Sequence, residues 1–227
     1  MGRTPKVAVL LAGCGHLDGA EVREAVLTLL ALDQHGADFK CIAPNANQHH
    51  VINHATGEAV GGQSRNILEE ASRISRVGQC LDLAKANPSE FDALLLPGGF
   101  GVAKNHCTFA FDGANASARK DVACFVLSFF QTKKPVGAIC ISPALVALIL
   151  KESGMHGKLT LGSGQGTRPA MEALKQEHVD VESARDVVID DELKLVTTPA
   201  YMFDDARLAD VFVGIERCVS AVLKLAQ

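Results

Sequence analysis

KPVGAICISP, residues 134–143, is the stretch around which the rest of the chain is organised. An apolar run ends in Cys140, and a helix-like run, 144–150, follows at once. This strand–cysteine–helix junction is typical of a nucleophile elbow, a turn so sharp that the side chain at its tip projects from the sheet. A helix N-terminus also favours the thiolate, because its first N–H groups are unpaired. The residues alone leave a second interpretation open, in which Cys140 is a buried cysteine that closes a core strand.

Segments on both sides of this stretch alternate between strand-like and helix-like patterns. Residues 6–12 form a continuous apolar run, as expected for a strand that is buried on both faces of a parallel sheet. Similar patterns predict strands at 38–43, 92–96, 135–139 and 159–161, and helices at 21–35, 64–75, 117–131, 169–176 and 205–226. Because alternating strands and helices imply right-handed crossovers, we expect a three-layer α/β sandwich with a mostly parallel sheet. No repeat or linker is visible, so the chain is expected to be a single domain, 1–227.

Other segments are less regular. Turn signals predict two hairpins, one joining 51–53 to 58–60 and one joining 186–190 to 193–197. A short helical piece is expected at 81–86, and Ser64 is the expected cap of the helix that runs to Ser75. The helix at 21–35 carries a broad apolar stripe made of Val22, Ala25, Val26, Leu29, Leu30 and Leu32.

Composition excludes several classes of function. Hydrophobic residues make up 48% of the 227 residues, the net charge is −4, and no basic block points to nucleic acid or to an anionic membrane surface. The seven cysteines are an odd number without a C-x-x-C pair, which argues against a structural zinc site and a thioredoxin-type motif, and no metal site is expected. No apolar run approaches the ~18 residues that cross a bilayer. A reduced compartment is expected, cytoplasmic unless a transit peptide was removed before residue 1.

Three loops at the predicted carboxyl ends of strands carry residues that could do chemistry together. Cys140 is the candidate nucleophile, and Glu21 could hydrogen-bond its sulfur and shuttle a proton. The N–H groups of Gly98, Gly99 and Ile141 could form an oxyanion hole. A thiolate beside a carboxylate is unfavourable, so Glu21 is expected to hold the proton. Simpler interpretations remain open: Glu21 complements the helix dipole, and the glycines form an ordinary tight turn.

These motifs resemble a known family. The residues that carry the resemblance are DGAE at 18–21, PGGFG at 97–101 with Lys104-Asn105, AICISP at 138–143, GCG at 13–15, His54 with Gly57-Glu58, Arg65-Asn66, and VTTPAYM at 196–202. Together they are similar to the enhancing-lycopene-biosynthesis (ElbB-type) family of the PfpI, class I glutamine amidotransferase-like superfamily, which includes mitochondrial members in animals. The resemblance implies a flavodoxin-like sandwich, a Cys140 nucleophile with Glu21 as partner, no cofactor, and a homodimer.

Two departures from the superfamily pattern narrow the expected chemistry. Ile141 follows the cysteine where the PfpI proteases have histidine, and no His-x-Glu occurs for a glutaminase triad; His178-Val179-Asp180 is the nearest substitute. We therefore expect a glyoxalase-type enzyme that converts small aldehydes, such as methylglyoxal to lactate. His16 and His106 lie in suitable loops for an additional histidine, but neither is assigned. The alternatives are a redox-sensing or regulatory protein, and an amidotransferase-like subunit that acts through a partner.

Three further motifs carry weaker predictions. Gly13-x-Gly15 follows a strand, but the third glycine of a dinucleotide fingerprint would fall on Asp18. The glycines at 162, 164 and 166 could cradle an anion, although the lysine and hydroxyl of a P-loop are absent. His49, His50 and His54 are expected to be polar loop residues more than metal ligands.

Overall fold

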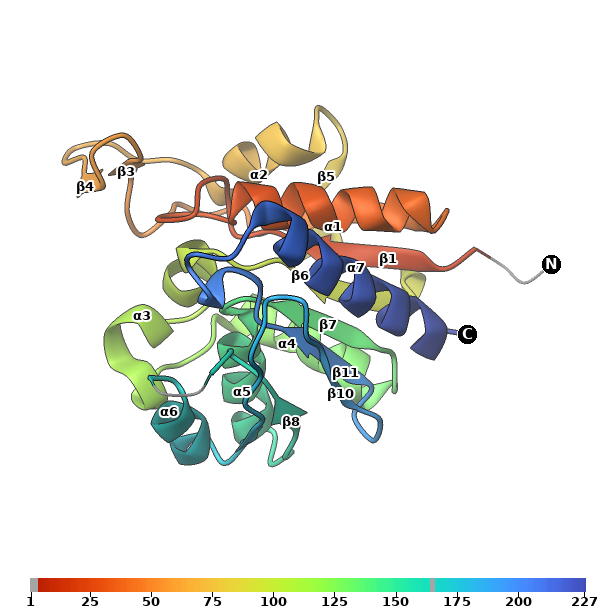
Figure 1. Ribbon diagram of the computed structural model, residues 1–227. Helices are drawn as coiled ribbons and strands as arrows, with labels where there is room; N and C mark the ends of the chain where they lie inside the picture. The colour runs from red at the N-terminus through yellow and green to blue at the C-terminus, as the bar shows by residue number, and fades with distance from the viewer. Residues whose placement is uncertain (1–3, 164–165) are drawn as a thin grey trace.

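The computed structural model describes residues 4–163 and 166–227, and a seven-stranded sheet lies at its centre (Figure 1). The strand order is β10-β11-β7-β6-β1-β2-β5, and every neighbouring pair is parallel except the β10–β11 hairpin. The strands of this sheet are β1 (Lys6–Leu10), β2 (Asp38–Ala43), β5 (Cys80–Asp82), β6 (Ala93–Leu96), β7 (Val136–Ile139), β10 (Val188–Asp190) and β11 (Leu195–Thr198). Two small sheets pair β3 (Ile52–Asn53) with β4 (Glu58–Ala59), and β8 (Lys158–Leu159) with β9 (Glu177–His178).

Helices cover both faces of the sheet, which gives three layers (Figure 1). The helices are α1 (Val22–Gln34), α2 (Ile67–Ser75), α3 (Phe109–Asp112), α4 (Lys120–Gln131), α5 (Ser142–Glu152), α6 (Arg168–Ala173) and α7 (Leu208–Leu225), together with short turns Leu83–Lys85, Pro88–Glu90, Val102–His106, Gly113–Asn115 and Ala200–Met202. The helices α1, α2 and α7 pack on one face, and α4 and α5 pack on the other. The predicted α/β sandwich is therefore confirmed as a flavodoxin-like fold.

The alternation of side chains along β1 explains why both faces are covered. Val7 and Val9 join the core under α1 and α7, whereas Ala8 and Leu10 join the core under α4 and α5, and all four are fully buried. Because successive side chains of a strand point to opposite faces, a strand that is apolar throughout needs helices on both sides. The continuous apolar run at 6–12 thus leads directly to the layered architecture.

Two local expectations differ from the structure. The segment expected to be helical at 81–86 begins as the edge strand β5 and becomes helical only at Leu83–Lys85. Asn66, not Ser64, caps α2, since its side-chain oxygen accepts from the N–H groups of Leu68 and Glu69 at 2.9 and 3.1 Å. Both predicted hairpins are present. Among the described residues, no helix is long and apolar enough to cross a membrane.

Candidate active site

The elbow predicted at Cys140 is present. Cys140 lies between β7 and α5 with φ of 61°, in the left-handed region that side-chain-bearing residues rarely adopt. This conformation costs about 1–2 kcal/mol, and two hydrogen bonds around it hold the turn in place. The Cys140 N–H donates to the Thr198 carbonyl at 2.9 Å, and the Ser142 hydroxyl donates to the Pro97 carbonyl at 2.9 Å. The elbow is therefore tied to both neighbouring strands, β6 and β11, at their carboxyl ends.

The carboxyl group beside the Cys140 thiol belongs to Glu24, and the expectation that Glu21 would contact the sulfur is wrong. Glu24 is fully buried and hydrogen-bonds the thiol. Its Oε2 accepts from the Gly98 N–H at 3.0 Å, and its Oε1 accepts from the Tyr201 N–H at 3.3 Å. Three strand-end loops therefore fix this carboxyl group from different sides.

Glu21 has a different position because it precedes the first helical residue of α1. Its backbone is extended, with φ of −66° and ψ of 118°, and its carboxylate accepts from the Glu24 N–H at 2.6 Å. This is the N-cap geometry that satisfies a free N–H group of the first turn. The simpler interpretation of Glu21, as a residue that complements the helix end, describes this contact. Glu21 nevertheless lines the cavity above Cys140, so it stays close to any substrate.

Burial controls the protonation of the acid–thiol pair. It is the largest cause that raises the pKa of Glu24 to about 8, and the charge of Glu21 adds to the effect. Burial also raises the pKa of the Cys140 thiol, followed by repulsion from an ionised Glu24. That repulsion disappears when Glu24 is protonated, and its O–H can then donate to the sulfur. The sequence predicts that the carboxyl group of the acid–thiol pair holds the proton, and in the structure that carboxyl group belongs to Glu24. The structure does not support a freely ionised Cys140 thiol at the helix end.

Backbone N–H groups around the sulfur are divided between two tasks. Those of Gly99 and Ile141 hydrogen-bond the Cys140 sulfur and lower its pKa, so both could serve a developing oxyanion next to it. The Gly98 N–H is already used by Glu24, so the expected place of Gly98 in the oxyanion hole is wrong. Gly98 contributes space: a Cβ there would lie 2.6 Å from the Cys140 Cβ and 2.7 Å from Glu24 Oε2.

A cavity of about 270 Å³ opens above the thiol. Cys140 itself is 8% exposed. Tyr201 stands in the wall, and its hydroxyl accepts from Arg23 Nη1 at 3.1 Å. The residues that line the cavity come from the loops after β1, β6, β7 and β11, and they are His16, Glu21, Gly99, Phe100, Cys140, Ile141, Tyr201, Met202 and Asp204. The sequence predicts a loop after β11. It does not predict that this loop reaches the site, because the sequence pattern does not specify that β11 lies beside β7.

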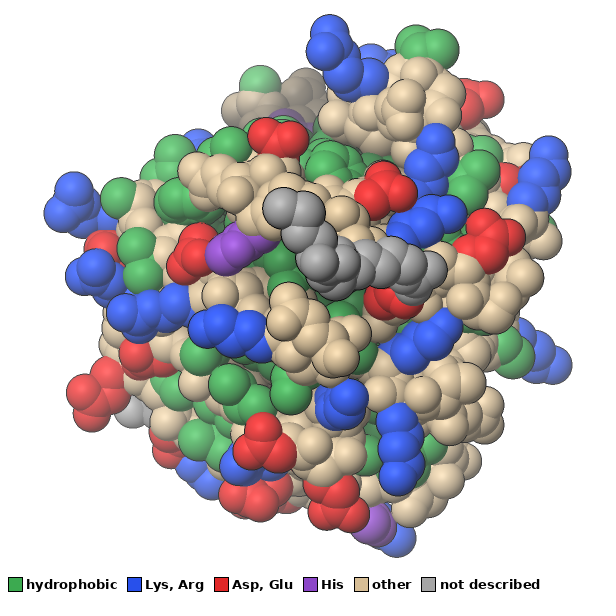
Figure 2. Space-filling model, turned by 90° about the vertical axis from the view of Figure 1, so that its right-hand side faces the viewer, with side chains coloured by type: hydrophobic (Ala, Val, Ile, Leu, Met, Phe, Trp, Pro, Cys, Tyr) green, Lys and Arg blue, Asp and Glu red, His purple; other side chains and the backbone are tan. Residues whose placement is uncertain are grey.

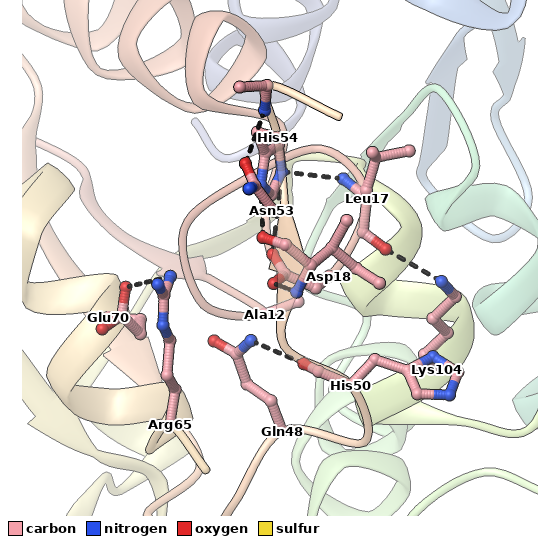
Figure 3. A network of polar contacts seen from close by, with 12 residues as sticks. Ala12, Leu17, Asp18, Gln48, His50, Asn53, His54, Arg65, Glu70 and Lys104 are labelled. Atoms are coloured by element: carbon pink, nitrogen blue, oxygen red, sulfur yellow. Dashed lines mark hydrogen bonds and ion pairs between the residues drawn. The ribbon is translucent and has the colours of Figure 1, made fainter. Parts of the chain in front are cut away.

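Several other residues that carry the family resemblance, among them Asp18, His54 and Lys104, form polar contacts around the loop after β1 (Figure 3). Asp18 is fully buried, and its Oδ2 accepts from the Ile52 N–H at 2.7 Å. The Leu17 N–H donates to His54 Nε2 at 3.3 Å, and Lys104 Nζ donates to the Leu17 carbonyl at 2.9 Å. These contacts tie the loop after β1 to the β3–β4 hairpin and to the segment after β6. His16 and Glu21 of the same loop line the cavity, whereas the residues that make these contacts do not.

The other histidines lie outside the cavity. His106 is fully buried, and burial lowers its pKa to about 4, so it stays neutral. His178 pairs with Asp180 at 3.2 Å near α6 and does not line the cavity with Cys140. Within the part of the chain that the structure describes, no group of three His, Cys, Asp or Glu residues could hold a metal ion. The anion cradle predicted at 162–166 includes position 164, which lies outside the described residues.

Comparisons with known proteins show which family the chain belongs to. The model of the "DJ-1/PfpI family" matches residues 6–206. The human protein "Glutamine amidotransferase-like class 1 domain-containing protein 3, mitochondrial" is 40% identical, over 97% of this chain and 83% of its own length. The rat "ES1 protein homolog, mitochondrial" is 39% identical, over 97% of this chain and 84% of its own length.

A solved structure is also similar throughout. The crystal structure of an "isoprenoid biosynthesis protein with amidotransferase-like domain" from Ehrlichia chaffeensis is 41% identical, with a TM-score of 0.87. The match covers 96% of this chain and 99% of that one.

Proposed function

Because the chain belongs to the DJ-1/PfpI family, we propose that it is a glyoxalase-type enzyme of the ElbB type, which acts on small reactive aldehydes without glutathione or a cofactor. Methylglyoxal, converted to lactate, is the model substrate. One observation carries the proposal: the Cys140 thiol lines a small cavity and is hydrogen-bonded to the buried Glu24 carboxyl group behind it. A thiol supplies the covalent step and a carboxyl group of raised pKa supplies the proton transfers.

The first step is addition of the Cys140 sulfur to the aldehyde carbon. The carbonyl electron pair moves to oxygen, where the N–H groups of Gly99 and Ile141 stabilise the negative charge. In the monoanion of the pair, ionised Glu24 takes the proton of the Cys140 thiol as the sulfur attacks and then delivers it to this oxygen, which gives a hemithioacetal. The carboxyl group is thereby left ionised, as the next step requires.

Glu24 then removes the proton from C1, the former aldehyde carbon, and the electron pair moves toward the carbonyl of C2, the adjacent ketone carbon, to form an enediolate. Return of that proton to C2 and transfer of the C1 hydroxyl proton to the C2 oxygen make C1 a thioester carbon and C2 a carbinol, so the oxidation of C1 balances the reduction of C2. No external oxidant or reductant is needed. Water hydrolyses the thioester, which releases lactate and restores the Cys140 thiol.

Lactate formation from methylglyoxal by purified protein, without glutathione, tests this proposal. We expect Cys140→Ala to abolish turnover and Glu24→Gln to lower kcat by about 10²–10⁴-fold, the range for loss of general acid–base catalysis. Cys124→Ala is the matched control, because Cys124 is an exposed cysteine of α4. Undiminished turnover in Cys140→Ala would rule the mechanism out.

The alternatives receive less support from the geometry. A redox sensor requires an accessible thiolate. Cys140 is largely buried and burial raises its pKa, which argues against rapid oxidation. An amidotransferase subunit requires a histidine next to the nucleophile. Among the described residues that line the cavity, His16 is the one histidine.

We also propose that the chain is a single-domain homodimer, which sedimentation equilibrium would test. The two curated relatives described above are named as mitochondrial proteins. We propose a mitochondrial location if this chain comes from a eukaryote and a cytoplasmic one if it comes from a bacterium.

A further inference from the structure

We propose that the Cys140 cavity selects uncharged or cationic electrophiles and rejects anionic ones, through the carboxylates of Glu21 and Asp204. The inference builds on the proposed function by naming its substrate class: uncharged 2-oxoaldehydes, or those that carry an ammonium group. Aldehydes and ketones that carry a carboxylate are excluded.

The charges that line the cavity are negative. Glu21 and Asp204 are the carboxylates in its wall, and no lysine or arginine is found among the lining residues that the structure describes. His16 is the one basic side chain among the described lining residues, and the other side chains there are apolar or aromatic apart from the thiol. The field of Glu21 reaches the reaction centre, because its charge contributes to the raised pKa of Glu24. A second negative charge brought in by a substrate would meet the same repulsion.

The neighbouring cations are already engaged. The Arg23 guanidinium is hydrogen-bonded to the Tyr201 hydroxyl, and the charge of Glu21 acts on it. Lys104 Nζ lies 5.3 Å from the centre of the Phe100 ring, donates to the Leu17 carbonyl, and interacts electrostatically with buried Asp18.

The carboxylate of Asp204 is the excess charge. No ion pair within 4.0 Å joins it to a basic residue in the part of the chain that the structure describes. Since Arg23 partly offsets Glu21 and Asp18 offsets Lys104, the balance around the opening is negative. Asp204 is therefore the principal selectivity residue, and Glu21 is the second.

Thiol modification tests this selectivity without relying on turnover. Three methanethiosulfonate reagents of similar size, which carry a trimethylammonium, a methyl or a sulfonate group, each form a mixed disulfide and release methanesulfinate. Their rates at Cys140 are followed by peptide mass spectrometry and divided by their rates with 2-mercaptoethanol. We expect the cation-to-anion rate ratio at Cys140 to exceed that at exposed Cys124.

Removal of a cavity carboxylate should reduce the cation-to-anion rate ratio at Cys140. At low salt, Asp204→Asn is expected to lower it about three- to tenfold, the effect of one unit charge several ångströms away at intermediate dielectric. Glu21→Gln should lower it less, because Arg23 partly offsets that charge. Asp205→Asn is the matched control, since Asp205 is exposed but does not line the cavity. An unchanged ratio in Asp204→Asn, or an equal fall in Asp205→Asn, would overturn the proposal.

A parallel assay separates this inference from the proposed function. Wild-type protein should convert methylglyoxal faster than the anionic aldehyde glyoxylate, and Asp204→Asn should narrow the difference. Absence of turnover with both aldehydes, together with a high modification ratio, would refute the glyoxalase activity and support the charge selection. Equal turnover of methylglyoxal and glyoxylate, together with a cation-to-anion modification ratio at Cys140 no higher than that at Cys124, would refute the charge selection and leave the glyoxalase activity standing.

Discussion

Replacement of Gly98 by alanine tests how tightly the acid–thiol pair is packed. The added Cβ would lie 2.6 Å from the Cys140 Cβ, 2.7 Å from Glu24 Oε2 and 2.9 Å from the Ile139 carbonyl oxygen. Real Cβ atoms essentially never show contacts under 3.0 Å. The elbow or Glu24 must therefore move. Overpacking of this kind costs about 1–3 kcal/mol, and we expect Gly98→Ala to lose that much stability.

In Gly98→Ala, the activity of the folded protein should also fall, by more than the lost stability alone would cause. Displacement of Glu24 breaks its bond from the Gly98 N–H and misplaces the carboxyl group relative to the thiol, where an error of 1 Å can cost 10²-fold in rate. Urea unfolding and methylglyoxal turnover are measured side by side at a temperature where the variant is folded. Gly61→Ala is the control, since a Cβ at Gly61 meets nothing within 4 Å. Equal stability and activity in wild type and Gly98→Ala would refute this account of the packing.

The remaining predictions concern protonation and helix capping. Burial raises the pKa of folded Glu24 to about 8, above the ~4.3 of an unfolded glutamate, so the wild type loses stability as pH rises from about 4 to 8. Glu24→Gln has no carboxyl group to ionise, so its stability relative to wild type should rise by a few kcal/mol between pH 5 and pH 9; urea midpoints that move in parallel would contradict this. Asn66→Ala should cost about 1 kcal/mol of unfolding free energy through loss of the α2 cap, whereas Ser64→Ala should cost nothing measurable. An effect of Ser64→Ala as large as that of Asn66→Ala would restore Ser64 as the cap.

The elbow and the layers could be predicted from local pattern, because each depends on residues close in sequence. The apolar run before Cys140 predicts a buried strand, and the run after it predicts a helix. Gly98 and Gly99 were placed near the thiol because strand ends of a parallel sheet meet at one edge. The Gly98 N–H and the Gly99 N–H have different hydrogen-bond acceptors, and the amino-acid composition does not predict which acceptor each N–H contacts.

Glu24 was missed because the buried face of α1 was placed incorrectly. Val22, Val26 and Leu30 were assigned to the apolar stripe, but they are 39%, 47% and 42% exposed. Ala25 and Leu32 of the predicted stripe are buried, but the buried face also carries Glu24, Thr28 and Ala31. A glutamate at the spacing of buried alanines and leucines was the available signal. An acid also fits the first turn of any helix, so this signal had an ordinary explanation.

The central claim is that Glu24, not Glu21, is the acid coupled to the Cys140 thiol. Its most direct test is a pH titration of the glutamate carboxyl carbons by ¹³C NMR. We predict one carboxyl resonance that titrates near pH 8 in the wild type and is absent from Glu24→Gln. In Glu21→Gln the same resonance should remain but titrate at a lower pH, because a neighbouring negative charge is removed. Persistence of that resonance in Glu24→Gln, or its loss in Glu21→Gln, would contradict the account.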